Sequence, residues 1–253
     1  MIIGVIPARF ASSRLLGKPL ADIGGKPMIQ RTYESACTSK LLDEVIIAVD
    51  DEKLFEKVES FGAKVFLTPK EIPTGSDRIA HVIKDLYKAE IIVNIQGDEP
   101  FIPGRMIDEA IEPLLFDPTV QVSTLAKKIE SVEEYKSTSI PKVVFDYNNF
   151  ALYFSRSPIP HVRDTKSNLA KIKKADIYKH IGLYVFRREA LLDFTNLEKT
   201  DLEEAEKLEQ LRMLEFGYRI KIVITEYESI SVDTPEDLER ARKYYERHLK
   251  NKK

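Results

Sequence analysis

The strongest chemical signal in the sequence is a basic loop directly after the first apolar segment. That segment, IIGVI at 2–6, is followed by PARFASSRLLGKP, which carries three cations: Arg9, Arg14 and Lys18. Small residues between them, such as Ser12 and Ser13, let the backbone approach a bound group closely. Cations beside free backbone N–H groups suit a polyphosphate. The loop therefore predicts a phosphate-binding site, with a solvated basic loop as the alternative.

The loop departs from two common phosphate-binding motifs. Ser12 stands where a Walker A motif has its first glycine, and Pro19 follows Lys18. The loop also lacks the GxGxxG fingerprint of dinucleotide-binding folds. The prediction thus depends on the position of the cations beyond the carboxyl end of a first strand, where open α/β sheets bind their ligands.

Two acidic residues are candidates for binding Mg²⁺. Asp98 follows the apolar run 91–96 and Gly97, which places it past a predicted strand and over the same cleft as the basic loop. Mg²⁺ is usually bound by one or two carboxylates plus substrate phosphates. Either acid could instead cap a turn or helix. For Asp233, directly before a Thr-Pro pair, the residues alone favour the helix cap.

Polar residues on predicted strands of the second half are candidates for binding a substrate. His180 and Tyr184 are four residues apart, so on a strand they share one face. Arg156 ends another strand. A lone histidine is more often structural than catalytic, and Arg156 could equally be a surface cation.

The first half of the chain alternates apolar strands with helical patterns. The predicted strands are 2–6, 44–49, 64–67 and 91–96. The predicted helices are 27–39, 51–61, one capped by Ser76 or Asp77 and running to about 87, and 103–116. This alternation predicts right-handed crossovers and a parallel sheet, and therefore the α/β class.

The second half has a different pattern. Strands are expected at 120–127, 142–145, 150–155, 181–186 and 218–225, and helices at 203–216 and from 234 to about 250. The sequence DYNN at 146–149 predicts a hairpin turn, and the basic segment 165–176 predicts a loop. We predict one α/β domain over 1–253, with a β-rich lobe between about 120 and 186.

The composition excludes several classes of protein. Of the 253 residues, 43% are apolar and 32% charged, which excludes general disorder. With 39 basic and 41 acidic residues, the net charge of -2 gives no reason to expect a nucleic-acid or anionic-membrane partner. No apolar run approaches the ~20 residues that a membrane helix needs. Cys37 is the one cysteine, so no intrachain disulfide is possible, and a reducing cytoplasm is expected.

Residues 6–20 resemble the signature loop of the CMP-Kdo synthetases, also called 3-deoxy-manno-octulosonate cytidylyltransferases. Further blocks match the family in order: NIQGDEP at 94–100, ALYFSR at 151–156, HIGLY at 180–184, LEQLR at 208–212 and VDTPEDL at 232–238. The family usually has proline where this chain has Leu16, a difference that removes no charge. The resemblance covers nearly the whole chain, and its ordered blocks are more specific than any single motif.

The resemblance implies a Rossmann-like nucleotide-diphospho-sugar transferase fold. This fold has a mostly parallel central sheet flanked by helices, with a β-rich lobe for sugar binding and dimerisation. It implies transfer of CMP from CTP to the anomeric hydroxyl of 3-deoxy-D-manno-octulosonate (Kdo), which gives CMP-Kdo and pyrophosphate for lipopolysaccharide biosynthesis. It further implies a homodimer with Mg²⁺ as cofactor.

The resemblance also assigns roles to residues. The expected catalytic residues are Lys18, Arg9, Arg14, Asp98 and Asp233, and the last two are the expected Mg²⁺ ligands. The expected nucleotide-binding residues are Pro7, Ala8, Arg9, Ser12, Ser13, Arg14, Lys18, Gly75, Ser76, Arg78, Gln96 and Asp98. The expected sugar-binding residues are Gln96, Arg156, His180, Tyr184, Glu209 and Gln210. At Ser76 and Asp77 the family more commonly has threonine and glutamate.

Two alternatives remain open from the sequence. One is cytidylyl transfer to a related acidic sugar, such as an 8-amino Kdo analogue or a sialic-type sugar. The other is a non-catalytic nucleotide-binding protein on the same fold. The sequence identifies no general base and does not set the number of Mg²⁺ ions.

Overall fold

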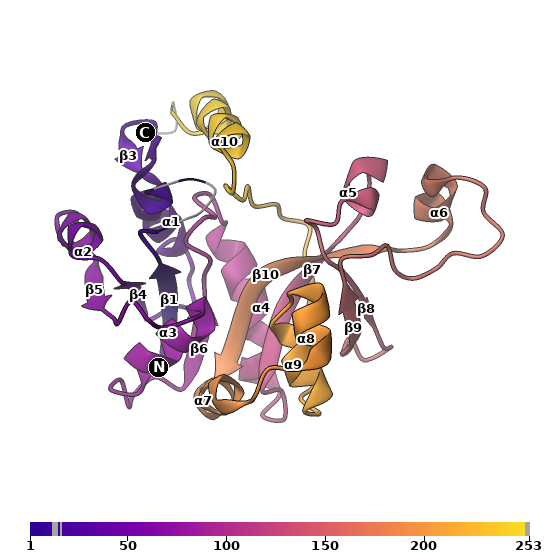
Figure 1. Ribbon diagram of the computed structural model, residues 1–253, viewed down its shortest axis with the longest axis horizontal. Helices are drawn as coiled ribbons and strands as arrows, with labels where there is room; N and C mark the ends of the chain where they lie inside the picture. The colour runs from indigo at the N-terminus through magenta and orange to yellow at the C-terminus, as the bar shows by residue number, and fades with distance from the viewer. Residues whose placement is uncertain (12–14, 16, 251–253) are drawn as a thin grey trace. The chain divides into compact units, whose positions relative to one another are not determined.

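A computed structural model of the chain describes residues 1–11, 15 and 17–250. It divides the chain into two compact units (Figure 1). The first contains Met1–Asp108 and Tyr227–Lys253, and the second contains Glu109–Glu226. The β-rich lobe predicted at 120–186 lies inside the second unit, which also takes in the segments on both sides of it.

The first unit is built on a parallel sheet. Its strands are β1 (Ile2–Ala8), β4 (Glu44–Val49), β5 (Lys64–Leu67) and β6 (Ile91–Asn94). β1 lies between β4 and β6, and β5 pairs with β4, all in parallel register. β6 is buried along its whole length and β4 along all but its first residue. Such burial is expected because strands of a parallel sheet are covered on both faces and have continuous apolar sequences. The predicted parallel sheet is confirmed.

Helices α1 (Met28–Ala36), α2 (Glu52–Glu59), α3 (Gly75–Ile83) and α10 (Pro235–His248) belong to the first unit, and α4 (Gly104–Phe116) leads out of it. Shorter elements follow the basic loop: η1 (Lys18–Leu20), β2 (Asp22–Ile23) and β3 (Lys26–Pro27). The cap predicted for α3 is wrong. Thr74 is the N-cap, and its hydroxyl accepts from the N–H of Asp77, since a cap bonds the third residue after itself.

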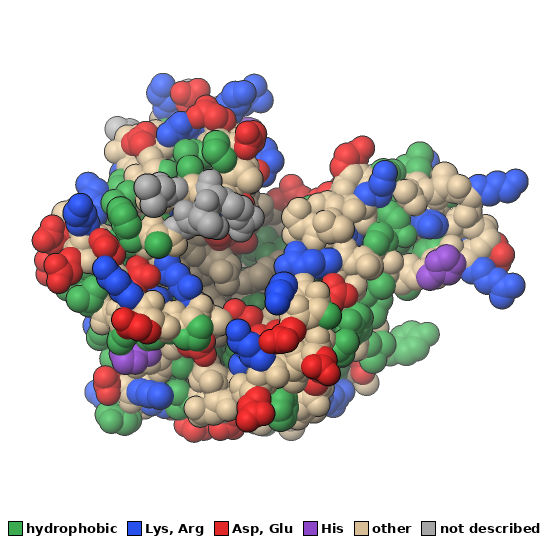
Figure 2. Space-filling model, in the orientation of Figure 1, with side chains coloured by type: hydrophobic (Ala, Val, Ile, Leu, Met, Phe, Trp, Pro, Cys, Tyr) green, Lys and Arg blue, Asp and Glu red, His purple; other side chains and the backbone are tan. Residues whose placement is uncertain are grey.

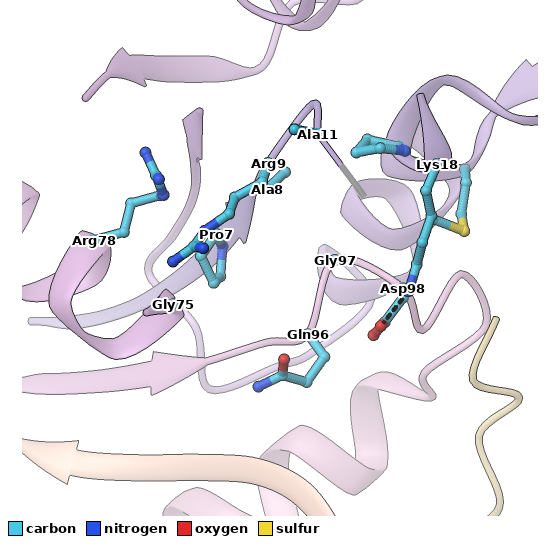
Figure 3. A pocket seen from close by; sticks show the side chains of 12 residues that line it. Pro7, Ala8, Arg9, Ala11, Lys18, Gly75, Arg78, Gln96, Gly97 and Asp98 are labelled. Atoms are coloured by element: carbon cyan, nitrogen blue, oxygen red, sulfur yellow. Dashed lines mark hydrogen bonds and ion pairs between the residues drawn. The ribbon is translucent and has the colours of Figure 1, made fainter. Parts of the chain in front are cut away.

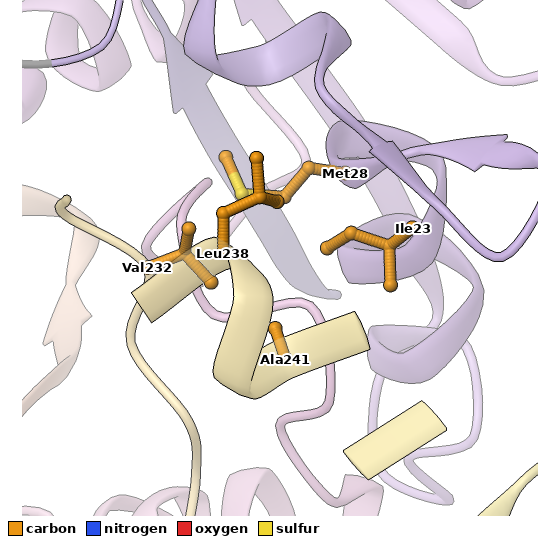
Figure 4. Close-up of a cluster of buried hydrophobic side chains, with 5 residues drawn as sticks. All are labelled: Ile23, Met28, Val232, Leu238 and Ala241. Atoms are coloured by element: carbon orange, nitrogen blue, oxygen red, sulfur yellow. The ribbon is translucent and has the colours of Figure 1, made fainter. Parts of the chain in front are cut away.

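Helix α10 joins the first unit from the far end of the chain. Its buried side chains pack with residues that follow the basic loop, as Figure 4 shows, in one cluster: Ile23, Met28, Val232, Leu238 and Ala241. The Arg31 guanidinium lies 4.1 Å from the centre of the Tyr245 ring and adds a cation–π contact. This packing fixes the start of α10 beside the loop that carries Lys18.

The second unit has a mixed sheet. Its strands are β7 (Val122–Lys128), β8 (Lys142–Phe145), β9 (Ala151–Ser155), β10 (Tyr178–Arg187) and β11 (Ile220–Ile224). β7 pairs antiparallel with β10 and parallel with β11, and β8 pairs antiparallel with β9 and with the start of β10. The predicted turn between β8 and β9 is confirmed: the Asp146 carboxylate accepts from the N–H groups of Asn148 and Phe150.

Several helices of the second unit differ from the sequence prediction. α5 (Val132–Lys136) and α7 (Arg188–Asn196) were not expected, and α6 (Asn168–Lys174) lies in the predicted loop. Ser167 caps α6, and Ile172 is buried in an apolar cluster with Ile129 and Tyr135, so tertiary burial stabilises this basic segment. The helix expected at 203–216 is two helices, α8 (Asp201–Glu206) and α9 (Gln210–Glu215). Lys207 separates them because its φ of 53° is left-handed.

On the face shown in Figure 2, basic and acidic side chains are interspersed, in keeping with the near balance of charges in the sequence. No helix among the described residues is long and apolar enough to span a bilayer.

The turn after α1 depends on one buried carboxylate. Asp108 is 2% exposed, and its Oδ1 accepts from the Ser39 hydroxyl and from the N–H groups of Lys40 and Leu41, at 2.6, 3.0 and 3.1 Å. We expect Asp108→Ala to lower the free energy of unfolding by about 1–3 kcal/mol, because partly buried donors lose their charged acceptor. Urea unfolding followed by circular dichroism measures the change. The control Asp85→Ala, at an exposed position, should stay within about 0.5 kcal/mol of wild type; equal effects would contradict the argument.

Candidate active site

A pocket of about 360 Å³ opens at the carboxyl end of β1 (Figure 3). Residues from the end of β1, the basic loop, the start of α3 and the segment after β6 form it. Its lining is Pro7, Ala8, Arg9, Ala11, Lys18, Pro19, Met28, Gly75, Arg78, Gln96, Gly97 and Asp98. This is the position where parallel sheets bind ligands.

The lining contains eight of the residues predicted to bind the nucleotide: Pro7, Ala8, Arg9, Lys18, Gly75, Arg78, Gln96 and Asp98. Ser76 is not in the lining, although its side chain is buried beside it in α3. Ser12, Ser13 and Arg14 lie outside the described residues. The sequence prediction missed Ala11, Pro19, Met28 and Gly97 as lining residues. Ala11 and Pro19 belong to the basic loop and Gly97 adjoins Asp98, so their places in the sequence could have indicated them; Met28 had no such signal.

Two glycines allow the walls of the pocket to approach β1. A Cβ on Gly97 would lie 3.0 Å from the carbonyl oxygen of Pro7, and a Cβ on Gly75 would lie 3.3 Å from the Pro7 ring. Both distances are shorter than ordinary van der Waals contacts. Glycine at these positions therefore brings the start of α3 and the loop carrying Asp98 against the end of β1.

Lys18 joins the two predicted metal ligands. Its Nζ donates to Oδ2 of Asp98 at 2.7 Å and to Oδ1 of Asp233 at 2.9 Å. The Lys18 side chain is 13% exposed, against 26% for Asp98 and 37% for Asp233. Figure 3 shows the Lys18 side chain reaching Asp98 across one end of the pocket. Residues far apart in the sequence thus form one ionic cluster of opposite charges.

The start of α10 explains why Asp233 is available to this cluster. Thr234 is the N-cap, and Asp237 accepts from the N–H groups of Asp233 and Thr234 in a capping box. The helix-cap alternative for the Asp233 carboxylate is therefore wrong, and the predicted Thr-Pro helix start is confirmed. The N–H of Val232 also donates to the carbonyl oxygen of Asp98 at 2.9 Å, which holds the two acidic segments side by side.

Arg9 directly follows the last residue of β1. Its Nη2 donates to the carbonyl oxygen of Ile72 at 3.0 Å and also to that of Pro73. The residue is exposed and lines the pocket. Arg9 thus carries an accessible positive charge and ties the segment before α3 to the basic loop.

Arg78 was expected to bind the nucleotide; its residue belongs to the pocket lining, but its guanidinium bonds groups of the protein. It is fully buried: Nη2 lies 3.4 Å from Oδ2 of Asp50, and Nη1 donates to the Thr68 hydroxyl. Burial lowers the pKa of the Arg78 guanidinium, and the Asp50 charge opposes that shift. Oδ1 of Asp50 in turn accepts from the N–H of Phe10 at 2.9 Å. Asp50, which the sequence prediction missed, therefore connects the basic loop to α3.

Glu99 is a buried carboxyl directly behind Asp98. Burial, followed by the charge of Asp98, raises the pKa of Glu99 to about 7, and the Ser229 hydroxyl partly opposes this shift. Oε2 of Glu99 has no hydrogen-bond partner among the described residues. The folded chain therefore favours the neutral form of this side chain, which reduces repulsion with the neighbouring carboxylate.

The sugar-binding residues predicted from the resemblance fall on both units. Gln96 lies in the first unit, where its Nε2 is 3.3 Å from Oδ1 of Asn94. The others lie in the second unit: Arg156, His180, Tyr184, Glu209 and Gln210. The polar set is therefore contributed by separate compact units.

His180 and Tyr184 lie on β10 with their ring centres 5.4 Å apart. Nε2 of His180 is 3.0 Å from the hydroxyl of Thr124 on the neighbouring strand β7, a partner that the sequence prediction missed. Burial lowers the pKa of His180 to about 3, so the imidazole is neutral at physiological pH. Burial, followed by the charge of Glu209, raises the pKa of Tyr184 well above its usual value.

Arg156 positions the chain next to Glu209 and Gln210. Its guanidinium donates to the carbonyl oxygens of Glu206, Lys207 and Thr138, at 2.6, 3.1 and 3.0 Å. These bonds fix the left-handed turn at Lys207 between α8 and α9. Gln210 is 5% exposed, and its Nε2 has no hydrogen-bond partner among the described residues. The geometry gives Arg156 a positioning role in addition to its charge.

Comparison with known proteins identifies the family. The cytidylyltransferase family model matches residues 3–222. A 3-deoxy-manno-octulosonate cytidylyltransferase of Geotalea uraniireducens (strain Rf4) is 51% identical over 243 residues, which cover 94% of this chain and 96% of the relative. The chain belongs to the cytidylyltransferase family.

Solved structures support the same assignment. A CMP:2-keto-3-deoxy-manno-octonic acid synthetase complexed with CTP is 39% identical and has a TM-score of 0.91, with 98% of this chain and 99% of that chain covered. A 4-diphosphocytidyl-2C-methyl-D-erythritol synthase from Anaerococcus prevotii DSM 20548 is 16% identical, with a TM-score of 0.63 over 97% of this chain and 98% of that one. The second likeness shows the fold alone. The predicted family and the predicted nucleotide-diphospho-sugar transferase fold are confirmed.

Glu99 gives the first unit a testable dependence of stability on pH. The unfolded carboxyl ionises near its ordinary value of 4.5, whereas the folded one ionises at about 7. The folded state therefore loses stability as the pH rises through 7, by about 3 kcal/mol at most. We expect Glu99→Gln to be more stable than wild type at pH 8.5, and to lose most of that advantage at pH 5, in urea unfolding. The exposed control Glu71→Gln should show no such trend. An advantage of Glu99→Gln that is independent of pH would contradict the assignment.

Proposed function

We propose that this protein transfers CMP from CTP to the anomeric hydroxyl of Kdo, giving CMP-Kdo and pyrophosphate. The observation that carries the proposal is the Lys18 ammonium between Asp98 and Asp233 at the nucleotide pocket. It occurs in a chain that matches named 3-deoxy-manno-octulosonate cytidylyltransferases over almost its whole length. Both acids and the described loop cations are present, which favours an enzyme over a non-catalytic nucleotide-binding protein.

The cations of the pocket would bind the triphosphate. Arg9 directly follows β1, and Lys18 begins η1; both line the same pocket. In attack on the α-phosphorus, negative charge grows on the α-phosphate oxygens and on the leaving pyrophosphate. Cations that are already positioned there stabilise the transition state, with its increased negative charge, more than they stabilise the bound substrate. Arg14, outside the described residues, would add a third cation from the same loop.

Asp98 and Asp233 would hold Mg²⁺. An all-oxygen pair of carboxylates is a donor set that Mg²⁺ prefers, with phosphates and water completing the coordination. Both oxygens lie within hydrogen-bonding distance of one nitrogen, so they can converge on a single small cation. Among the described residues there is no group of three or more His, Cys, Asp or Glu side chains arranged for a metal, so the phosphates would supply further ligands. When bound, Mg²⁺ polarises phosphate oxygens and lowers the pKa of a coordinated hydroxyl.

The acidic sugar would be bound by the polar residues of the second unit. Neutral His180 can accept or donate a hydrogen bond. The Tyr184 hydroxyl and Nε2 of Gln210, which have no hydrogen-bond partner among the described residues, can bond sugar hydroxyls. Arg156 would contribute positive charge toward the sugar carboxylate. Binding both substrates in a reactive geometry contributes to the rate because it removes the entropic cost of bringing them together.

The reaction is tested directly by pyrophosphate release. Purified protein with CTP, Kdo and Mg²⁺ should release pyrophosphate, and EDTA should stop the release. Asp98→Asn should lower kcat/KM by more than about 100-fold with an unchanged circular-dichroism spectrum. Mutation of a residue that only supports a metal ligand already lowers metal affinity or activity by roughly 10–100-fold. Asp85→Asn, at an exposed site, should match wild type.

No pyrophosphate above background, beside an active positive control, would end the proposal. The same assay distinguishes the related sugars: with 8-amino-Kdo or a sialic-type sugar at equal concentration, Kdo should be consumed first. CTP binding without turnover on any of these sugars would instead support a nucleotide-binding protein.

The setting we propose is a cytoplasmic homodimer that supplies CMP-Kdo to lipopolysaccharide biosynthesis. The dimer would form through the second unit, where apolar side chains are exposed on the β8–β9 hairpin, Tyr147 fully and Leu152 by 63%, and on α6, where Leu169 is 50% exposed. Exposed apolar patches of this kind commonly mark protein interfaces. Sedimentation equilibrium at micromolar concentration should give the mass of two chains, and Leu152→Glu should shift the distribution to one. A wild-type monomer would contradict the dimer.

A further inference from the structure

The ammonium of Lys18 occupies the place where the two acidic side chains converge. Nζ of Lys18 contacts both carboxylates within 2.9 Å, and the lysine side chain is mostly buried. These are the same oxygens that a divalent cation needs. Two positive groups cannot share them without strong repulsion, because like charges a few ångströms apart repel strongly where solvent is partly excluded. Lys18 and a divalent cation therefore compete for one site.

Backbone hydrogen bonds fix the main chain at Lys18, whereas the ammonium group at the end of its side chain can move. Lys18 starts η1, and the turn is held by bonds from the N–H of Lys18 to Leu15, of Leu20 to Gly17 and of Ala21 to Lys18. The ammonium is at the end of four rotatable carbons and lies at the pocket wall. It can turn from the carboxylates toward a triphosphate in the pocket without movement of the backbone.

We propose that Lys18 is an internal counter-ion of the Asp98–Asp233 pair, which excludes a free divalent cation until a nucleotide triphosphate draws the ammonium away. The proposal rests on the proposed function only for the identity of the nucleotide. Its consequence is an order of binding: the divalent cation enters with the triphosphate or after it. The same lysine thus keeps the carboxylates together before the nucleotide binds and neutralises phosphate afterwards.

The energetic logic is a coupling between two ligands. A metal ion that binds the carboxylates must first displace Lys18. The free energy of the broken ion pair then makes the binding of the metal less favourable. When a triphosphate is bound, Lys18 has already moved from the carboxylates to the phosphates, so the metal no longer has to displace it. Each ligand therefore raises the affinity for the other by the same factor. Typical couplings of this kind correspond to roughly 5–150-fold in affinity.

The test measures Mn²⁺ binding without nucleotide, by titration followed by electron paramagnetic resonance of the free ion. Lys18→Met keeps an unbranched side chain close to the length of lysine and removes its charge. We expect it to bind Mn²⁺ about tenfold or more tightly than wild type. Lys18→Arg keeps the charge and should bind as weakly as wild type. Lys18→Gln is the second uncharged variant and should behave as Lys18→Met.

The matched control is Arg9→Met. Arg9 is also a cation of the pocket wall, but its guanidinium bonds the carbonyl oxygens of Ile72 and Pro73 and not the acids. Its removal changes the net charge equally and should alter Mn²⁺ affinity in the absence of nucleotide by less than about twofold. An equal gain in Arg9→Met and Lys18→Met would show a general effect of charge and overturn the proposal.

Nucleotide supplies the second measurement. With a non-hydrolysable CTP analogue, Mn²⁺ affinity should rise more in wild type than in Lys18→Met, because only wild type has a counter-ion to release. Tight Mn²⁺ binding to wild type without nucleotide, or equal affinities of folded wild type, Lys18→Met and Lys18→Gln, would overturn the proposal. Since none of these measurements uses Kdo, failure of the sugar reaction with the expected Mn²⁺ results would reject the proposed function alone.

Discussion

The pocket of the first unit depends on two carboxylates that lie close together and on the lysine that neutralises their charge. Asp98 and Asp233 carry negative charge at one pocket edge, and the Lys18 ammonium bonds both. Two facing carboxylates repel one another, so their approach requires either a cation or rigid support from the backbone. This chain provides both, through the lysine and through the bond from Val232 to the carbonyl of Asp98.

The surrounding elements keep these charges in place. The apolar cluster under α10 fixes the segment that carries Asp233, and the capping box uses Thr234 and Asp237, which leaves the Asp233 carboxylate for the cluster. On the other side of β1, buried Asp50 bonds the basic loop and Arg78. The cations that face the pocket are thus supported by buried ionic and hydrogen bonds behind them.

The second unit follows a different principle. Its polar side chains are held largely by neutral hydrogen bonds and burial, as with His180 and Thr124, and its fixed turn at Lys207 is held by Arg156 through backbone carbonyls. Burial keeps His180 neutral and Tyr184 protonated. Neutral donors and acceptors suit the hydroxyl groups of a sugar, whereas the first unit presents the charges that suit phosphates and a metal.

Sequence patterns were enough to predict the parallel strands, the basic loop, the two acidic candidates and the Thr-Pro start of the last helix. Each of these follows from local composition or periodicity, or from a resemblance that preserves residue order. The pairing of these charges, in contrast, depends on the tertiary fold. No local pattern shows that Lys18 bonds Asp98 and Asp233, that Arg78 turns inward to Asp50, or that Thr124 partners His180, because these contacts join distant segments. Helix α6 and the break at Lys207 were missed for the same physical reason: burial of Ile172 and the carbonyl bonds of Arg156 outweigh the local preference of the chain.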